Sequence, residues 1–191
     1  AVISSIQRDS QIQIFEDLKL AIIKIDSTVG GNLAQGKIGV DQLIRIGNEM
    51  DAIKDRDEYT FIALLHHHPK GIDEPDWYAK EWYEAILGNQ YEATMKLIDA
   101  DYFLKWMNQR GIHYVLHGHK HIPYVQQHNE ITIVGAGSTT GSVKCKGKDK
   151  TYISYNLIKY DVNERRPVAV IICYEEILGA GTKSMLAYSM A

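Results

Sequence analysis

Six of the eight histidines lie in two short clusters, which are the residues in this chain best suited to chemistry. The first cluster fills positions 66–68, directly before Pro69, and the second takes every other position from 117 to 121. A neutral imidazole is a good ligand for zinc, iron and related ions. We therefore predict that the two clusters bind metal, whereas the lone His113 and His128 are predicted to be ordinary surface or core residues.

Each cluster follows a short apolar run that is typical of a buried strand, at residues 59–65 and 112–116. Ligands bind beyond the carboxyl ends of strands in open α/β sheets, so both clusters occupy positions suited to a site. If residues 119–121 are extended, His119 and His121 point to the same side. Gly118 allows the backbone to bend there. Periodicity alone does not choose among the residues at 66–68, nor does it exclude His117.

The rest of the chain alternates predicted strands and helices before ending in strands alone, which indicates an α/β fold with a mixed sheet or two packed sheets. Gly111 is expected to end the last helix. The predicted elements are a strand at 19–25, a loop at 30–31, a helix at 40–53, a helical region at 76–109 broken at 88–89, and an antiparallel meander of strands at 130–134, 152–158 and 168–174.

Composition excludes several classes of protein. The 191 residues suit one domain, and the net charge of −3 lacks the basic excess of a nucleic-acid binder. The lysines at 144–150 alternate with other residues and are expected to form a solvated loop. Two widely separated cysteines form no disulfide framework, so a cytoplasmic setting is expected. No stretch reaches the ~18 apolar residues of a membrane helix.

The sequence around each cluster resembles motifs of the calcineurin-like metallophosphoesterases. Leu116–His121 resembles the Gly-His-x-His motif that closes their metal site, and Leu64–Pro69 resembles the histidine motif before it. Ile22–Ser27 and Val134–Ser138 resemble the flanking segments, so the likeness spans most of residues 20–175. It implies a four-layer α/β/β/α sandwich, with residues 1–191 forming one partial domain, the C-terminal half.

The resemblance also implies a site and a reaction. His66 and His119 would bind one metal ion and His121 a second ion. The other clustered histidines would orient these ligands from behind, namely His67, His68 and His117. Two divalent ions (Mn, Fe or Zn) would then clamp a small phosphorylated substrate and hydrolyse its phosphate ester, as a phosphomonoesterase or phosphodiesterase.

Three earlier motifs of that family are absent: Asp-x-His, Gly-Asp-x-x-Asp and Gly-Asn-His. Gly-Asn occurs at 31–32, 47–48 and 88–89, never followed by histidine, and the middle pair falls within the predicted helix. The carboxylate ligands and the proton donor are therefore expected in an upstream half of the domain or a partner chain, and the isolated chain is expected to be inactive. The alternatives are a non-catalytic or truncated half that serves binding and assembly, and a histidine-rich module with one tetrahedral zinc ion.

Overall fold

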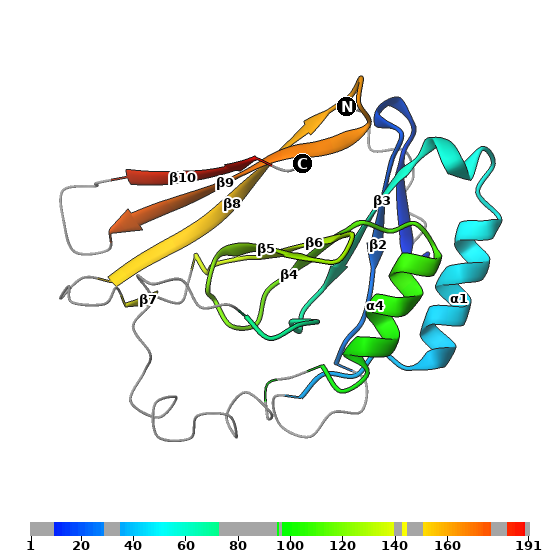
Figure 1. Cartoon of the computed structure of the whole chain (residues 1–191), viewed down its shortest axis with the longest axis horizontal. Coiled ribbons are helices and arrows are strands. Elements are labelled where there is room, and N and C mark those ends of the chain that lie inside the picture. The colour runs from blue at the N-terminus through cyan, green and yellow to red at the C-terminus, as the bar shows by residue number, and fades with distance from the viewer. Residues whose placement is uncertain are drawn as a thin grey trace.

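The computed structural model of the chain shows a mixed α/β fold built on a central mixed sheet, which confirms the predicted fold class at that level (Figure 1). It describes residues 10–28, 35–72, 95, 97–139, 143–144, 151–176 and 183–189. The strands and helices, in chain order, are β1 (Ile12–Phe15), β2 (Leu20–Lys24), α1 (Val40–Asp51), β3 (Thr60–Leu65), α4 (Ala100–Gln109), β4 (Tyr114–His117), β5 (Tyr124–His128), β6 (Ile131–Gly135), β7 (Val143–Lys144), β8 (Thr151–Asp161), β9 (Arg166–Glu176) and β10 (Lys183–Ser189).

The central sheet has six strands in the order β1-β2-β3-β4-β6-β5. Strands β2, β3, β4 and β6 run parallel to one another, and β1 and β5 pair antiparallel at the two edges. Parallel strands require a crossover connection, and α1 supplies the one between β2 and β3. The carboxyl ends of β2, β3 and β4 consequently meet at one edge of the sheet, where the histidine clusters follow β3 and β4.

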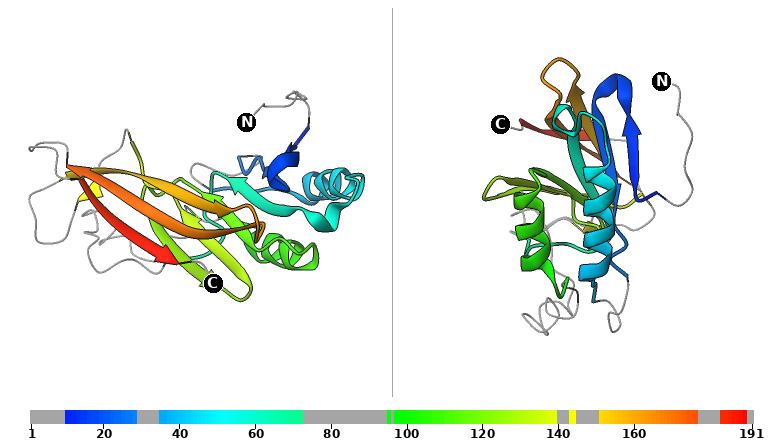
Figure 2. Two further views of the ribbon diagram at one scale, coloured as in Figure 1. Left: turned by 90° about the horizontal axis from the view of Figure 1, so that it is seen from above. Right: turned by 90° about the vertical axis from the view of Figure 1, so that its right-hand side faces the viewer.

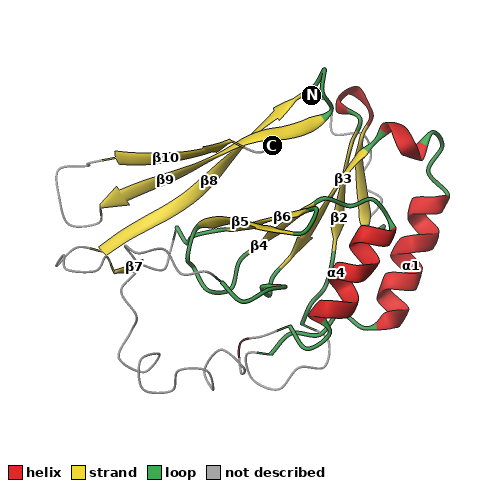
Figure 3. Cartoon of the chain, viewed as in Figure 1, coloured by secondary structure: helices red, strands yellow, loops and turns green. Residues whose placement is uncertain are grey.

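The last strands form a second, four-stranded antiparallel sheet in the order β10-β9-β8-β7. Helices α1 and α4 cover one face of the six-stranded sheet, and the second sheet packs against the other (Figures 1, 2 and 3). The described part of the chain thus forms three layers, α/β/β. The outer helical layer of the predicted four-layer sandwich is not among these residues, so it stays a prediction, as does the assignment to half of a domain.

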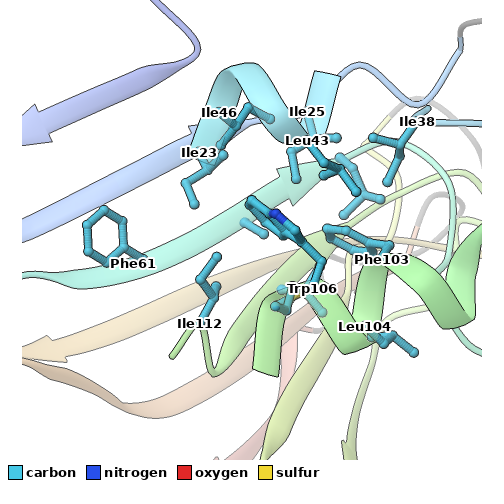
Figure 4. Packing of buried hydrophobic residues seen from close by; sticks show 14 of the residues in the cluster. Ile23, Ile25, Ile38, Leu43, Ile46, Phe61, Phe103, Leu104, Trp106 and Ile112 are labelled. Atoms are coloured by element: carbon cyan, nitrogen blue, oxygen red, sulfur yellow. The ribbon is translucent and has the colours of Figure 1, made fainter. Parts of the chain in front are cut away.

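The main hydrophobic core lies between the two helices and the six-stranded sheet (Figure 4). Alternate residues of β3, Phe61, Ala63 and Leu65, point into it, as the period of two along a strand requires. Phe103 and Trp106 fill it from α4, and their stacked rings have centroids 6.4 Å apart. This packing holds β3 and β4 rigidly at the base of the histidine clusters.

A second apolar cluster joins the two sheets. Ile62 and Tyr114 contribute from the six-stranded sheet, and Val170 and Ile172 from β9, where both are fully buried. The strand pair β8–β9 is longer than predicted, with 11 residues in each strand. The predicted meander is confirmed for these two strands and wrong for 130–134, because β6 instead pairs parallel with β4 inside the first sheet.

Where the structure describes them, the helices lie where the spacing of apolar residues predicts helices. Helix α1 buries Leu43, Ile46 and Met50 on one face, and it contains the Gly-Asn pair at 47–48, as predicted. Gly111 ends α4 in the left-handed conformation with φ 66°, which confirms the predicted stop. Most of the helical region predicted at 76–109 lies outside the described residues. No helix in the described ranges is long and apolar enough to span a membrane.

Candidate metal centre

The two histidine clusters follow neighbouring parallel strands. Leu65, the last residue of β3, pairs with His117, the last residue of β4. Directly beyond the strands, the N–H of Gly118 donates to the carbonyl of His66 over 3.1 Å. The loops that carry the clusters are therefore joined at the carboxyl edge of the sheet, where the strand order predicted them to lie.

His66 and His119 come into direct contact. The distance between Nε2 of His66 and Nδ1 of His119 is 2.9 Å, and the two ring planes meet at 75°. His66 is exposed and His119 is half-buried. Between two neutral imidazoles, one nitrogen carries the proton and the other accepts it. The segments that follow β3 and β4 thus bring two ring nitrogen atoms close together.

His67 belongs to the same group of side chains. One ring nitrogen from each of His66, His67 and His119 lies within 4.8 Å of the others. The centroid of the His67 ring lies 4.9 Å from that of His66 and 4.5 Å from that of His119. In contrast to His66, His67 is buried, so the group has an open side and a closed side.

The spacing of this group suits one metal ion. Two nitrogen ligands of a tetrahedral zinc ion, each about 2.0–2.1 Å from the metal, stand roughly 3.3 Å apart. The nitrogen atoms of His66 and His119 need to separate only slightly from their 2.9 Å contact. Within the described ranges, the group includes no carboxylate. Three imidazoles are a reasonable donor set for a single ion, and the predicted second ion stays a prediction.

His121 lies outside this group. The strand ends at His117, and both His119 (φ 75°) and His121 (φ 59°) adopt the left-handed conformation. The N–H of Lys120 donates to the carbonyl of Gly118 over 3.0 Å, so the chain turns here. The expectation that this segment is extended is therefore wrong. His121 is exposed, and its role as ligand of a second ion stays a prediction.

His117 and His68 are buried beneath the cluster. Burial lowers the pKa of His117 to about 4 and the pKa of His68 to about 3, so both rings are neutral at pH 7. Nδ1 of His117 donates to the carbonyl of Gly118 over 3.0 Å, and its Nε2 accepts from the hydroxyl of Tyr124. Both nitrogens of His117 therefore form hydrogen bonds within the fold, and the role predicted for it in orienting the metal ligands stays a prediction.

Two residues that the sequence did not assign to the site, Ser27 and Gly36, contact the ring of His67 and restrict its position. Oγ of Ser27 lies 2.9 Å from Nδ1 of His67, and a Cβ added to Gly36 would stand 2.4 Å from the Cγ of that ring. The strand-end rule could have found Ser27, because it follows β2 at the same edge of the sheet. Nothing in the sequence around Gly36 indicates that it lies against the ring of His67.

His66 also lines an open depression in the surface. This depression, of about 480 Å³, is lined in addition by Lys24, Asp26 and Leu64. The Asp26 carboxylate accepts from the hydroxyl of Thr28 at 2.6 Å and from its N–H at 2.8 Å, and these bonds lower the pKa of Asp26. An ammonium group and a carboxylate thus share this depression with the side chain of His66.

Comparisons with known proteins give only distant likenesses. No family model and no curated protein matches the sequence. A Vps29 double mutant from Entamoeba histolytica is 15% identical over 45% of this chain and 45% of its own length, with a TM-score of 0.29. A Vps29 single mutant from the same organism is 11% identical over 88% of this chain and 99% of its own, with a TM-score of 0.31.

A conserved uncharacterized protein from Streptococcus pneumoniae, described as a predicted phosphoesterase, is 9% identical over 86% of this chain and 97% of its own, with a TM-score of 0.27. Identities and TM-scores this low do not assign the chain to a family. The chemistry of the site must therefore be inferred from the geometry of its own residues.

Proposed function

We propose that this chain provides the histidine ligands of a metal-dependent phosphoesterase that hydrolyses a small phosphate ester. The carboxylate ligands would come from an upstream segment or from a partner chain. In this proposal His66 and His119 bind one divalent ion, and His121 serves a second. Manganese, iron and zinc all accept such ligands.

The contact between His66 and His119 carries the proposal. Their nitrogen atoms lie 2.9 Å apart although the residues are separated by more than fifty positions, because the strands before them pair in parallel. His66 lines an open depression of about 480 Å³, in which Lys24 can offset the negative charge of a phosphate. A bound divalent ion would polarise a phosphoryl oxygen and lower the pKa of bound water.

The first experiment measures metal binding by the 191-residue chain. We expect isothermal titration with Zn²⁺ or Mn²⁺ to show about one ion per chain. His119→Ala is expected to weaken binding at least tenfold, in line with the loss of one of a few ligands. His113→Ala is the matched control, because His113 lies at the far end of β4 and bonds the carbonyl of Glu130. Equal affinities in the two variants would contradict the proposal.

The second experiment measures turnover in a longer protein that includes the upstream segment. Hydrolysis of bis(p-nitrophenyl) phosphate is expected to depend on added metal and to fall on His119→Ala. Metal-independent activity, or activity that survives this substitution, would show that the cluster does not form the active site.

A binding and assembly role is the second candidate. Among the described residues no carboxylate joins the three histidines, and Leu64, beside the cluster, keeps 44% of its surface exposed. If the chain binds one zinc ion tightly and shows no hydrolytic activity even with its upstream segment, the result would favour a binding role or a simple zinc module and contradict the proposed enzyme. The predicted cytoplasmic setting stays untested.

A further inference from the structure

Asp26 and His66 line the same open depression in the surface. Asp26 follows β2 and His66 follows β3, and because these neighbouring strands run parallel, both residues lie at the carboxyl edge of the sheet. Lys24 and Leu64, which pair in register across the two strands, also line this depression of about 480 Å³. Leu64 keeps 44% of its surface exposed, so this part of the sheet is accessible to a ligand.

The fold fixes Asp26 through its backbone and through one carboxylate oxygen. Its N–H donates to the side-chain oxygen of Gln42 over 2.8 Å, and the side-chain nitrogen of Gln42, a buried residue of α1, donates to its carbonyl over 2.7 Å. Oδ1 accepts both hydrogen bonds from Thr28, which lower the pKa of Asp26 and keep the carboxylate ionised at neutral pH. Within the described ranges, Oδ2 has no hydrogen bond or ion pair, so it is available to a ligand.

Asp26 does not belong to the histidine donor set. No carboxylate of the described residues joins the three ring nitrogens that lie within 4.8 Å of one another. His121, proposed above for a second ion, is not among the residues that line the depression. An ion bound by Asp26 is therefore a separate one, on the side of His66 that faces the depression.

The charges in the depression favour a divalent ion together with a phosphate group. The ammonium of Lys24 pairs neither with Asp26 nor with any other residue in the part of the chain that the structure describes. The opposite charges of Lys24 and Asp26 cancel, so a dianionic phosphate alone would leave the depression negative, and one divalent ion restores the balance. Hard ions such as Mg²⁺ commonly bind to one or two carboxylates and complete their ligands with water and phosphate oxygens.

We propose that Oδ2 of Asp26 is a ligand of a hard divalent ion, Mg²⁺ or Mn²⁺, and that a phosphate group bridges this ion and the ammonium of Lys24. This site takes oxygen ligands, whereas the histidine group offers the nitrogen ligands that suit zinc. Gln42 is a positioning residue, because it holds both backbone polar groups of Asp26. The inference deepens the proposed function and rests on it for the phosphate ligand, and the ion can be measured without any turnover.

The first test titrates Mn²⁺ into the zinc-loaded chain in the presence of inorganic phosphate and measures free Mn²⁺ by electron paramagnetic resonance. Zinc keeps the imidazole ligands, because such sites bind it more tightly than Mn²⁺. We expect Asp26→Asn to weaken Mn²⁺ binding at least about tenfold and to leave zinc affinity unchanged. The asparagine oxygen can still accept both bonds from Thr28, so this variant removes the charge and keeps the turn.

Asp17→Asn is the matched control, because Asp17 is exposed in the turn before β2, at the opposite end of that strand from Asp26. Equal Mn²⁺ affinity in the two variants would overturn the proposal, as would a failure of the unmodified chain to bind Mn²⁺. Phosphate is expected to strengthen Mn²⁺ binding by the unmodified chain and to have little effect in Lys24→Gln. An equal effect of phosphate in both proteins would show that phosphate does not bridge the ion and Lys24.

The zinc measurements separate this inference from the proposed function. If His119→Ala loses zinc while Asp26→Asn binds Mn²⁺ as tightly as Asp17→Asn does, the inference is wrong and the histidine site stands. If His119→Ala retains zinc, the proposed histidine site is wrong, whereas Mn²⁺ binding that depends on Asp26 still supports the carboxylate site.

Discussion

The close approach of Gly36 to His67 predicts that Gly36→Ala damages both the fold and the site. The added Cβ would stand 2.4 Å from Cγ and 2.5 Å from Nδ1 of His67, whereas carbon atoms in ordinary contact are about 3.5–4.0 Å apart. The ring must therefore retreat by roughly 1 Å. Because Gly36 does not adopt the left-handed conformation, alanine adds no backbone strain of its own, and the whole effect arises from this collision.

The energetic cost follows from what the retreat breaks. Overpacking a buried site costs about 1–3 kcal/mol. A shift of the ring away from Ser27 also breaks the 2.9 Å bond to Nδ1, which contributes about 1 kcal/mol. We expect the free energy of unfolding to fall by about 2–4 kcal/mol, the sum of these two contributions. Zinc binding should also weaken, because the ring of His67 moves out of its place beside His66 and His119.

Urea unfolding followed by circular dichroism measures the first effect and isothermal titration the second. Gly71→Ala is the matched control, since a Cβ there meets no atom within 4 Å and the backbone is not left-handed. A Gly→Ala change at such a compatible position is neutral or stabilises by up to about 1 kcal/mol. If Gly36→Ala unfolds at the same urea concentration as Gly71→Ala, the assigned contact between Gly36 and His67 is wrong.

Three further predictions concern stability. Burial lowers the pKa of His117 to about 4 and that of His68 to about 3, both from 6.5. The unfolded chain therefore binds more protons than the folded chain below pH 6.5, and stability falls as the pH drops through this window. Between pH 7.5 and pH 5 in EDTA the two residues together should give about 4 kcal/mol of pH dependence in unfolding, of which His117→Gln should remove about 2 kcal/mol. Zinc at a hundred times its dissociation constant should raise the free energy of unfolding by about 2.7 kcal/mol, and His119→Ala should reduce this gain to about 1.4 kcal/mol or less at the same zinc concentration. Phe103→Ala should cost about 3–5 kcal/mol in urea unfolding, whereas its neighbour Tyr102, which is 47% exposed, should tolerate alanine within about 1 kcal/mol.

Much of the first sheet followed from local patterns. The apolar runs before Asp26 and His66 form β2 and β3 because buried parallel strands need continuous apolar residues, and that signal is contained in a few adjacent positions. Helix α1 followed from its apolar spacing in the same way. The edge strands β1, β5 and β10 did not, because a short edge strand depends on a partner strand more than on its own residues.

The sequence by itself determined that the two histidine clusters would lie near each other, since both follow strands whose carboxyl ends share one edge of a sheet. Only the tertiary structure decided which third histidine joins them. The backbone turns after His117, and the left-handed conformation of His121 was not predictable from its residue type. It also decided the place of Ser27, whose three contacts depend on the pairing of β2 with β3, because this pairing brings together the segments that follow these two strands.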